Sequence, residues 1–127
     1  MSGNFIRITP FIHVPDINAA VAFFTDLLGF TCYVRFSDYA YVQRETAGVR
    51  LLQNRGDDGA PPGNRRFAYY IDVNDIEALY QELKPKLGAL PPGDVHGPAD
   101  KEYGQRELCI LAPDGNLVVF GQSIEKR

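Results

Sequence analysis

The chain has 127 residues, of which 45% are hydrophobic and 23% are charged. This length allows one compact core but not two ordinary domains, and this composition excludes a wholly disordered chain. The formal net charge of −3 is spread evenly, with 5 basic and 6 acidic residues in 1–60 and 8 basic and 10 acidic residues in 61–127, so no basic surface for nucleic acid is predicted.

The first predicted elements are a strand that ends near His13 and an amphipathic helix that begins after Asp16. The carboxylate of Asp16 is expected to cap this helix, because it can accept hydrogen bonds from the open N–H groups of the first turn. Gly29 offers the left-handed conformation that commonly ends a helix. Apolar residues at the spacing of one helix face lie between them: Ile17, Ala20, Val21, Phe24, Leu27 and Leu28.

Three strands are predicted next, at Thr31–Phe36, Tyr39–Arg44 and Val49–Gln53, because these segments are rich in β-branched and aromatic residues. A tight turn around Thr46-Ala47-Gly48 is expected to join the last two strands. The segment Asn54–Arg65 is rich in Gly, Pro and Asp and has no periodicity, so it is predicted to be a linker or a mobile loop.

A second strand and helix follow, with Phe67–Val73 as the strand and Asp75 as the expected cap. Pro85 predicts that this helix ends or kinks near Lys84, and Gly88 is expected to adopt the left-handed conformation. The apolar face of this helix is formed by Ile76, Leu79, Tyr80, Leu83 and Leu87.

The chain then offers a weak strand near Asp94–His96 and two stronger strands, Gln105–Leu111 and Leu117–Gly121, around a turn at 112–116. The two halves are copies of one module, because the segment HVPDINAA at 13–20 is echoed by DVNDIEAL at 72–79. We therefore predict an α+β fold of two βαβββ modules. The predicted modules are 5–53 and 66–122, joined by a loop at 54–65 within a single domain, 1–127.

Cys32 and Cys109 each lie in an apolar, β-prone stretch, which favours free thiols in a reducing compartment over a disulfide. Residues 1–7 include no apolar run of secretory length, and no stretch approaches the ~20 apolar residues that span a bilayer. We therefore expect a cytoplasmic protein that does not contact membranes.

Several of these features together resemble the vicinal-oxygen-chelate superfamily, which includes glyoxalases, bleomycin-resistance proteins and extradiol dioxygenases. They are the Val-x-Asp-Ile motif at the start of both helices, Leu28-Gly29-Phe30, the stretch Tyr103–Glu107 and the turn Asp114–Asn116. Among the branches, bleomycin-resistance proteins look most similar. The resemblance implies a concave mixed sheet that forms a cup, with helices on the outer face.

The resemblance also implies where a metal would bind, because metal-dependent members place one ligand on the first strand and one near the last strand of each module. These positions are Thr9, Arg50, Ala68 and Val119 here. Divalent ions prefer His nitrogens and carboxylate oxygens, whereas Ala68 and Val119 have no donor atom and Arg50 is positively charged. Among the residues one position away, only Tyr69 could coordinate. We therefore expect neither a metal nor another cofactor.

Strand alternation predicts which residues face the cup. Tyr70 is assigned to the cup with Ala68 and Asp72, whereas Phe67, Tyr69, Ile71 and Val73 should face the helices. Arg50 would be costly under a helix, so it is assigned to the cup with Leu52, opposite Gln43 and Tyr41. With Tyr103 and Arg106 of the family segment, the predicted ligand-binding residues are Phe11, Tyr39, Tyr41, Arg50, Leu52, Tyr70, Tyr103 and Arg106.

Such a cup suits a small aromatic or amphipathic ligand, because rings stack and a guanidinium fixes orientation. The first hypothesis is a metal-free protein that sequesters a drug or a metabolite. The alternative is an enzyme, namely a glyoxalase-like lyase or isomerase, a dioxygenase or a thiol transferase, whose catalytic residues stay unassigned. A third possibility is a stress or regulatory module whose tyrosines only fill space. His13 is either a proton carrier near the cup or a structural residue.

Two further expectations come from the resemblance. Bleomycin-resistance proteins are dimers whose cups draw on both chains, so a homodimer is expected, and a long linker would allow the two modules to be swapped between chains. Those proteins tend to stack indoles on the planar rings of bleomycin, and this chain has no Trp. The absence of Trp counts against bleomycin itself as the ligand.

Overall fold

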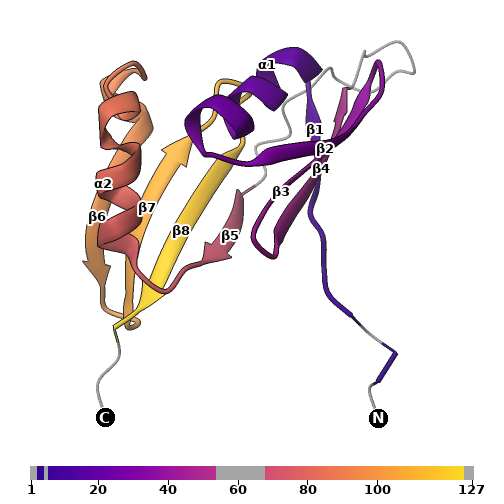
Figure 1. Ribbon diagram of the computed structural model, residues 1–127. Helices are drawn as coiled ribbons and strands as arrows, with labels where there is room; N and C mark the ends of the chain where they lie inside the picture. The colour runs from indigo at the N-terminus through magenta and orange to yellow at the C-terminus, as the bar shows by residue number, and fades with distance from the viewer. Residues whose placement is uncertain (1–2, 5, 54–67, 125–127) are drawn as a thin grey trace.

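Two mixed four-stranded sheets, each accompanied by one helix, form the protein in a computed structural model that describes residues 3–4, 6–53 and 68–124 (Figure 1). The predicted α+β fold of two modules is confirmed. The predicted loop at 54–65 and the predicted direction of Phe67 lie outside the described residues.

The first module has strand order β1-β4-β3-β2, with β1 parallel to β4 and the other neighbours antiparallel. Its strands are β1 (Phe11–Val14), β2 (Thr31–Arg35), β3 (Tyr39–Arg44) and β4 (Ala47–Gln53). The second module repeats this topology in the order β5-β8-β7-β6. Its strands are β5 (Ala68–Asp72), β6 (Val95–Lys101), β7 (Gln105–Leu111) and β8 (Leu117–Ser123), and a short helix, η2 (Pro92–Asp94), precedes β6.

Helix α1 (Ile17–Ala22) continues as a π-helical segment, η1 (Phe23–Leu27). The predicted cap is confirmed, since the Asp16 carboxylate accepts hydrogen bonds from the backbone N–H groups of Asn18 at 3.0 Å and Ala19 at 3.2 Å. Gly29 has the predicted positive φ of 78°. The buried helix face is wider than predicted and includes Phe23, because the Pro113-Asp114 turn of the second module covers this side of the helix.

Helix α2 (Ile76–Leu87) begins at the predicted cap, where Asp75 accepts from the Ala78 N–H at 3.0 Å. The prediction offered an end or a kink of α2 near Lys84, and an end there is wrong, because the helix continues through Pro85 to Leu87. Pro85 lies in the last turns, where it removes one helical hydrogen bond, and the buried Leu87 anchors the turn that follows. Gly88 is right-handed (φ −64°) and not left-handed as predicted, since the chain continues into further turns at Ala89 and Leu90.

The hairpin between β3 and β4 has a shorter turn than predicted. Arg44 pairs with Ala47, so the turn consists of Glu45 and Thr46, and Glu45 has a positive φ of 54°. The partner of Arg50 is consequently Tyr41, whereas the predicted partner was Gln43. This shift of two residues leaves every side chain on its predicted face, because side chains alternate with a period of two.

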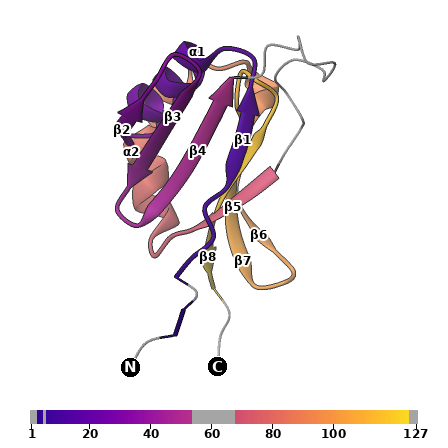
Figure 2. The same ribbon diagram turned by 90° about the vertical axis from the view of Figure 1, so that its right-hand side faces the viewer.

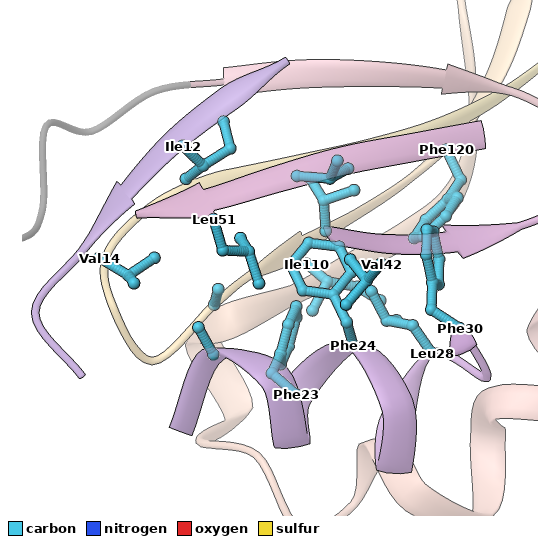
Figure 3. Packing of buried hydrophobic residues seen from close by; sticks show 14 of the residues in the cluster. Ile12, Val14, Phe23, Phe24, Leu28, Phe30, Val42, Leu51, Ile110 and Phe120 are labelled. Atoms are coloured by element: carbon cyan, nitrogen blue, oxygen red, sulfur yellow. The ribbon is translucent and has the colours of Figure 1, made fainter. Parts of the chain in front are cut away.

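The helix-facing sides of both sheets share one hydrophobic core. Figure 3 shows Phe24 and Leu28 of the first module in the same cluster as Ile110 and Phe120 of the second. Since alternate strand residues point to opposite sides, the other side of each sheet, here called its cup face, lies away from this core. Figure 2 views the first sheet from the side opposite α1.

An ion pair links the two modules on the helix side. The Arg44 guanidinium donates two hydrogen bonds to the Glu82 carboxylate, at 2.9 and 2.8 Å, and another to the Leu28 carbonyl at 2.8 Å. The hydrogen bond from Arg44 holds the pKa of Glu82 below its usual value. Both side chains are partly exposed to solvent, which screens the pair.

We expect Glu82→Gln to lower the free energy of unfolding by less than about 1 kcal/mol at neutral pH. Because the folded-state pKa of Glu82 is depressed, the pair's contribution is present above the unfolded pKa, about 4.3, and is lost as the pH falls through the folded value. Urea unfolding of the wild type and Glu82→Gln at about pH 7 and pH 3 measures the contribution of the ion pair. A difference between Glu82→Gln and the wild type that persists unchanged at the lower pH would contradict this assignment.

Within the described residues, no helix is both long enough and apolar enough to cross a bilayer.

Candidate ligand-binding faces

The cup face of the first sheet places an arginine among aromatic rings. Arg50 Nη1 donates to the Tyr39 hydroxyl at 2.9 Å, and the guanidinium lies 5.6 Å from the centroid of the Tyr41 ring. Phe11 pairs with Arg50 across β1 and β4, meets Tyr39 edge-on at 6.2 Å, and is 50% exposed. A guanidinium oriented in this way can donate to a ligand while the rings supply apolar area.

His13 and Leu52 extend the first cup face along β1 and β4, where they pair with each other. The His13 ring stacks on Phe11 at 6.2 Å with an interplanar angle of 14°. A hydrogen bond also connects His13 to the second module, since Asn116 Nδ2 donates to the His13 backbone carbonyl at 3.2 Å. The structure therefore brings five predicted residues together on this face: Phe11, Tyr39, Tyr41, Arg50 and Leu52.

The cup face of the second sheet is built around a buried carboxylate. Glu107 is only 6% exposed, and its Oε2 accepts hydrogen bonds from the hydroxyls of Tyr70 at 3.0 Å and Tyr103 at 2.9 Å. The two tyrosines are 42% and 65% exposed. Burial and the bond to Glu107 raise the pKa of Tyr70 to about 12. The bond to Glu107 also raises the pKa of Tyr103.

A glycine lies beneath the central tyrosine of each cup face. A Cβ atom on Gly121 would be 1.8 Å from the Tyr70 hydroxyl oxygen, and one on Gly48 would be 2.2 Å from that of Tyr41. Each ring thus lies over a strand position without a side chain, and the Tyr70 ring reaches across β8 to β7. Gly121 pairs with Glu107 and Gly48 pairs with Gln43, and these partners accept the tyrosine hydroxyls.

The sequence reasoning missed the roles of Gln43, Gly48 and Gly121 in these faces, and it left Glu107 as either a structural residue or a ligand contact. Gln43 was assigned to the cup without a role, and Gly48 was assigned to a turn. A glycine inside a strand often marks the close approach of another group, so this signal was available in the sequence.

Arg106 is not part of either cup face. It has the same strand parity as the buried Leu108 and Ile110, and it binds Asp100 through hydrogen bonds of 2.6 and 3.2 Å. The prediction that Arg106 binds ligand followed the family segment and not the alternation of β7, which assigns Glu107 to the cup face and Arg106 to the opposite one.

The residues at the four positions of a metal site do not fit a divalent ion. Ala68 and Val119 have no donor atom, and Arg50 is engaged with Tyr39 and Tyr41. Tyr69, the neighbour that could coordinate, packs against the core, and burial raises the pKa of its hydroxyl. Within the described part of the chain, no group of three or more His, Cys, Asp or Glu side chains could hold a metal ion.

A cleft of about 380 Å³ lies between the modules on the helix side. Leu28 and Phe30 of the first module and Val73 and Leu79 of the second line it, and the Arg44–Glu82 ion pair bridges it. We regard this cleft as the seam between the modules, because the tyrosines of both cup faces lie elsewhere.

Comparison with known proteins agrees with this fold. The sequence model of the Glyoxalase/Bleomycin resistance protein/Dioxygenase superfamily matches residues 6–120. Bleomycin resistance proteins of Geobacillus stearothermophilus and Staphylococcus aureus are 28% identical over 129 residues, which cover 91% of this chain and 96% of theirs.

Solved structures with the same fold include two antibiotic-binding proteins. The bleomycin-binding protein of Streptomyces verticillus, complexed with copper(II)-bleomycin, has a TM-score of 0.75 at 22% identity over 98% of this chain and 100% of that one. The antibiotic-binding protein TnmS3 of a Streptomyces species has a TM-score of 0.67 at 20% identity over 95% and 99%.

An enzyme has the same fold as well. Lactoylglutathione lyase of Agrobacterium tumefaciens has a TM-score of 0.71 at 17% identity over 95% of this chain and 96% of that one. The structural likeness by itself therefore shows the fold, and the family follows from the match over residues 6–120. The predicted resemblance is confirmed, and this chain belongs to the glyoxalase/bleomycin resistance protein/dioxygenase superfamily.

Proposed function

We propose that this protein sequesters a small, ring-bearing ligand without the help of a metal, as a binding protein of the bleomycin-resistance type. The observation that carries this proposal is the pair of cup faces, each presenting a tyrosine that lies over a glycine and donates to a Gln or Glu acceptor. Exposed rings held in one orientation suit a planar ligand. Since Cys32 and Cys109 are free, we also propose that the protein works in the cytoplasm.

Binding is tested by a thermal-shift screen of planar antibiotics and aromatic metabolites, bleomycin included, followed by calorimetric titration of each compound that raises Tm. A sequestering protein returns its ligand chemically unchanged after incubation, and a chelator leaves the affinity unaltered. Mass spectrometry of the recovered compound separates this function from that of a lyase, a dioxygenase or a transferase. Turnover of the compound, or affinity that depends on added metal, would overturn the proposal.

We further propose that the working form is a homodimer in which the cup face of module 5–53 of one copy meets that of module 66–122 of the other. In a single chain the exposed fractions of Phe11, Tyr70 and Tyr103 are 50%, 42% and 65%. Exposed rings of this kind are commonly covered by a partner or a ligand. A two-fold arrangement would close two equivalent sites. A swap of modules through the 54–65 segment would give the same sites.

Light scattering at micromolar protein concentration should therefore report a mass of about twice 14.2 kDa. Dilution should dissociate the dimer and weaken ligand binding in parallel, because each site would then lose one wall. A monomer throughout this concentration range that still binds the ligand with one cup face would contradict the shared site.

Arg50→Ala should weaken binding of an anionic or carbonyl-bearing ligand by about tenfold to a hundredfold, because hydrogen bonds to a charged group contribute about 1.5–3 kcal/mol each. Folding should persist, since Arg50 is exposed and contacts the hydroxyl of Tyr39 and the ring of Tyr41. Arg106→Ala is the matched control and should bind normally. Equal losses in both variants would mean that the face assignment is wrong.

A further inference from the structure

We propose that Glu107 positions Tyr70 and Tyr103 and sets the polarity of the second cup face, so that a ligand presents a planar ring bearing a hydrogen-bond donor or a positive charge to it. This inference rests on the proposed ligand-binding function and adds the chemistry that one wall of the site selects.

The position of Glu107 makes it the centre of this face. It lies on β7 between Ala99 of β6 and Gly121 of β8, so its strand neighbours have small or no side chains. A buried carboxylate is costly unless it accepts hydrogen bonds, and the hydroxyls of Tyr70 and Tyr103 donate two of them to Oε2. The carboxylate and the two phenols therefore form one unit.

The direction of these bonds decides what the face can offer to a ligand. A tyrosine hydroxyl has one hydrogen to donate, and both hydroxyls donate it to Glu107. The oxygens of all three side chains are consequently available only as acceptors, and the rings present electron-rich faces. A group with N–H or O–H hydrogens is favoured there, and a carboxylate is repelled.

The two cup faces differ in this respect although the modules repeat. In the first module the acceptor of the tyrosine hydroxyl is Gln43, which is neutral, and Arg50 supplies donors beside it. In the second module the acceptor of the Tyr70 hydroxyl is the charged Glu107. The first face thus favours acceptors on the ligand, and the second face favours donors or cations.

The same unit restrains the rings before a ligand arrives. Tyr70 is held between Gly121 and Glu107, and the 65% exposed ring of Tyr103 is tied to Glu107 through its hydroxyl. A ring that is already ordered loses less conformational freedom on binding. Removal of the acceptor should therefore weaken binding of any ring, whereas removal of the charge alone should change only the preference among rings.

The test uses two substitutions at one position and a pair of matched probes. Glu107→Gln keeps an oxygen that accepts from both phenols and removes the charge, and Glu107→Leu removes both properties. Glu102→Gln removes the same charge from an exposed position on the same hairpin and is the control. The probes are naphthylmethylammonium and naphthylmethanol, which share one ring system, and each is titrated calorimetrically into the full-length protein.

We expect the wild type and Glu102→Gln to bind the ammonium probe about tenfold more tightly than the alcohol. Glu107→Gln should bind the alcohol as the wild type does and lose the preference for the ammonium. Glu107→Leu should lose about tenfold in affinity for both probes while its circular dichroism stays native. An undiminished preference in Glu107→Gln would overturn the polarity assigned to Glu107 and leave the proposed function standing.

A second measurement needs no ligand and therefore separates the two proposals. Near-ultraviolet absorbance follows tyrosine ionisation. In Glu107→Gln, part of the ionisation should occur at lower pH than in the wild type, because the carboxylate raises the pKa values of Tyr70 and Tyr103. Tyr70 should still titrate above free tyrosine, because burial is the larger cause of its shift. An unchanged titration would overturn the positioning role. If neither probe and no compound of the screen binds the wild type, the proposed function fails even where the titration shifts.

Discussion

Phe24→Ala should lower the free energy of unfolding by about 3–5 kcal/mol, the usual effect of emptying a buried phenylalanine site. Phe24 is 2% exposed, and its ring meets Phe23 and Phe30 edge-on at 5.5 and 5.1 Å. Figure 3 shows it between the helix of the first module and the strands of the first sheet, in one cluster with residues of the second module. The loss is large because one side chain supports the core that both modules share.

Urea unfolding monitored by circular dichroism measures this change. Phe36→Ala is the matched control, because it removes the same side chain from a site that is 65% exposed, and it should cost about 0.5 kcal/mol or less. If the midpoints of the two variants coincide, η1 does not pack into the shared core as described.

Gly121→Ala should reduce affinity for a ring-bearing ligand by tenfold or more and leave the protein folded. The new Cβ would lie 1.8 Å from the hydroxyl oxygen of Tyr70 and 2.3 Å from its Cζ, so the ring has to swing away and release Glu107. The atoms that clash belong to the far end of a side chain, and β8 itself can stay in place. Gly121→Ala should therefore disrupt the ligand-binding site while the second sheet stays folded.

Calorimetric titration with the tightest ligand of the screen and thermal unfolding are the two measurements for this variant. Gly88→Ala is the control, because a Cβ there meets nothing within 4 Å and its backbone is right-handed. Gly48→Ala makes the same change beneath Tyr41 on the first cup face. Normal binding by Gly121→Ala would show that Tyr70 does not contact the ligand in the orientation described.

Local patterns predicted the elements well. The capping carboxylates of Asp16 and Asp75 and the apolar spacing of both helices were predicted correctly, because caps and helix faces depend on residues within a few positions of one another. The face of Arg50 was also predicted, since the period of two tolerates the shift in the β3–β4 pairing. The extent of α2 was not, because the burial of Leu87 outweighs the local preference of Pro85.

By itself, the sequence determined the duplicated βαβββ module, its helix caps and the faces of its strands, since each of these follows from residue type and local spacing. Only the tertiary structure decided that both helix-facing sides share a core and that Glu107 gathers Tyr70 and Tyr103. The reason is that these arrangements depend on contacts between strands and modules, such as Tyr70–Glu107 and Arg44–Glu82, which are 37 and 38 residues apart in the chain.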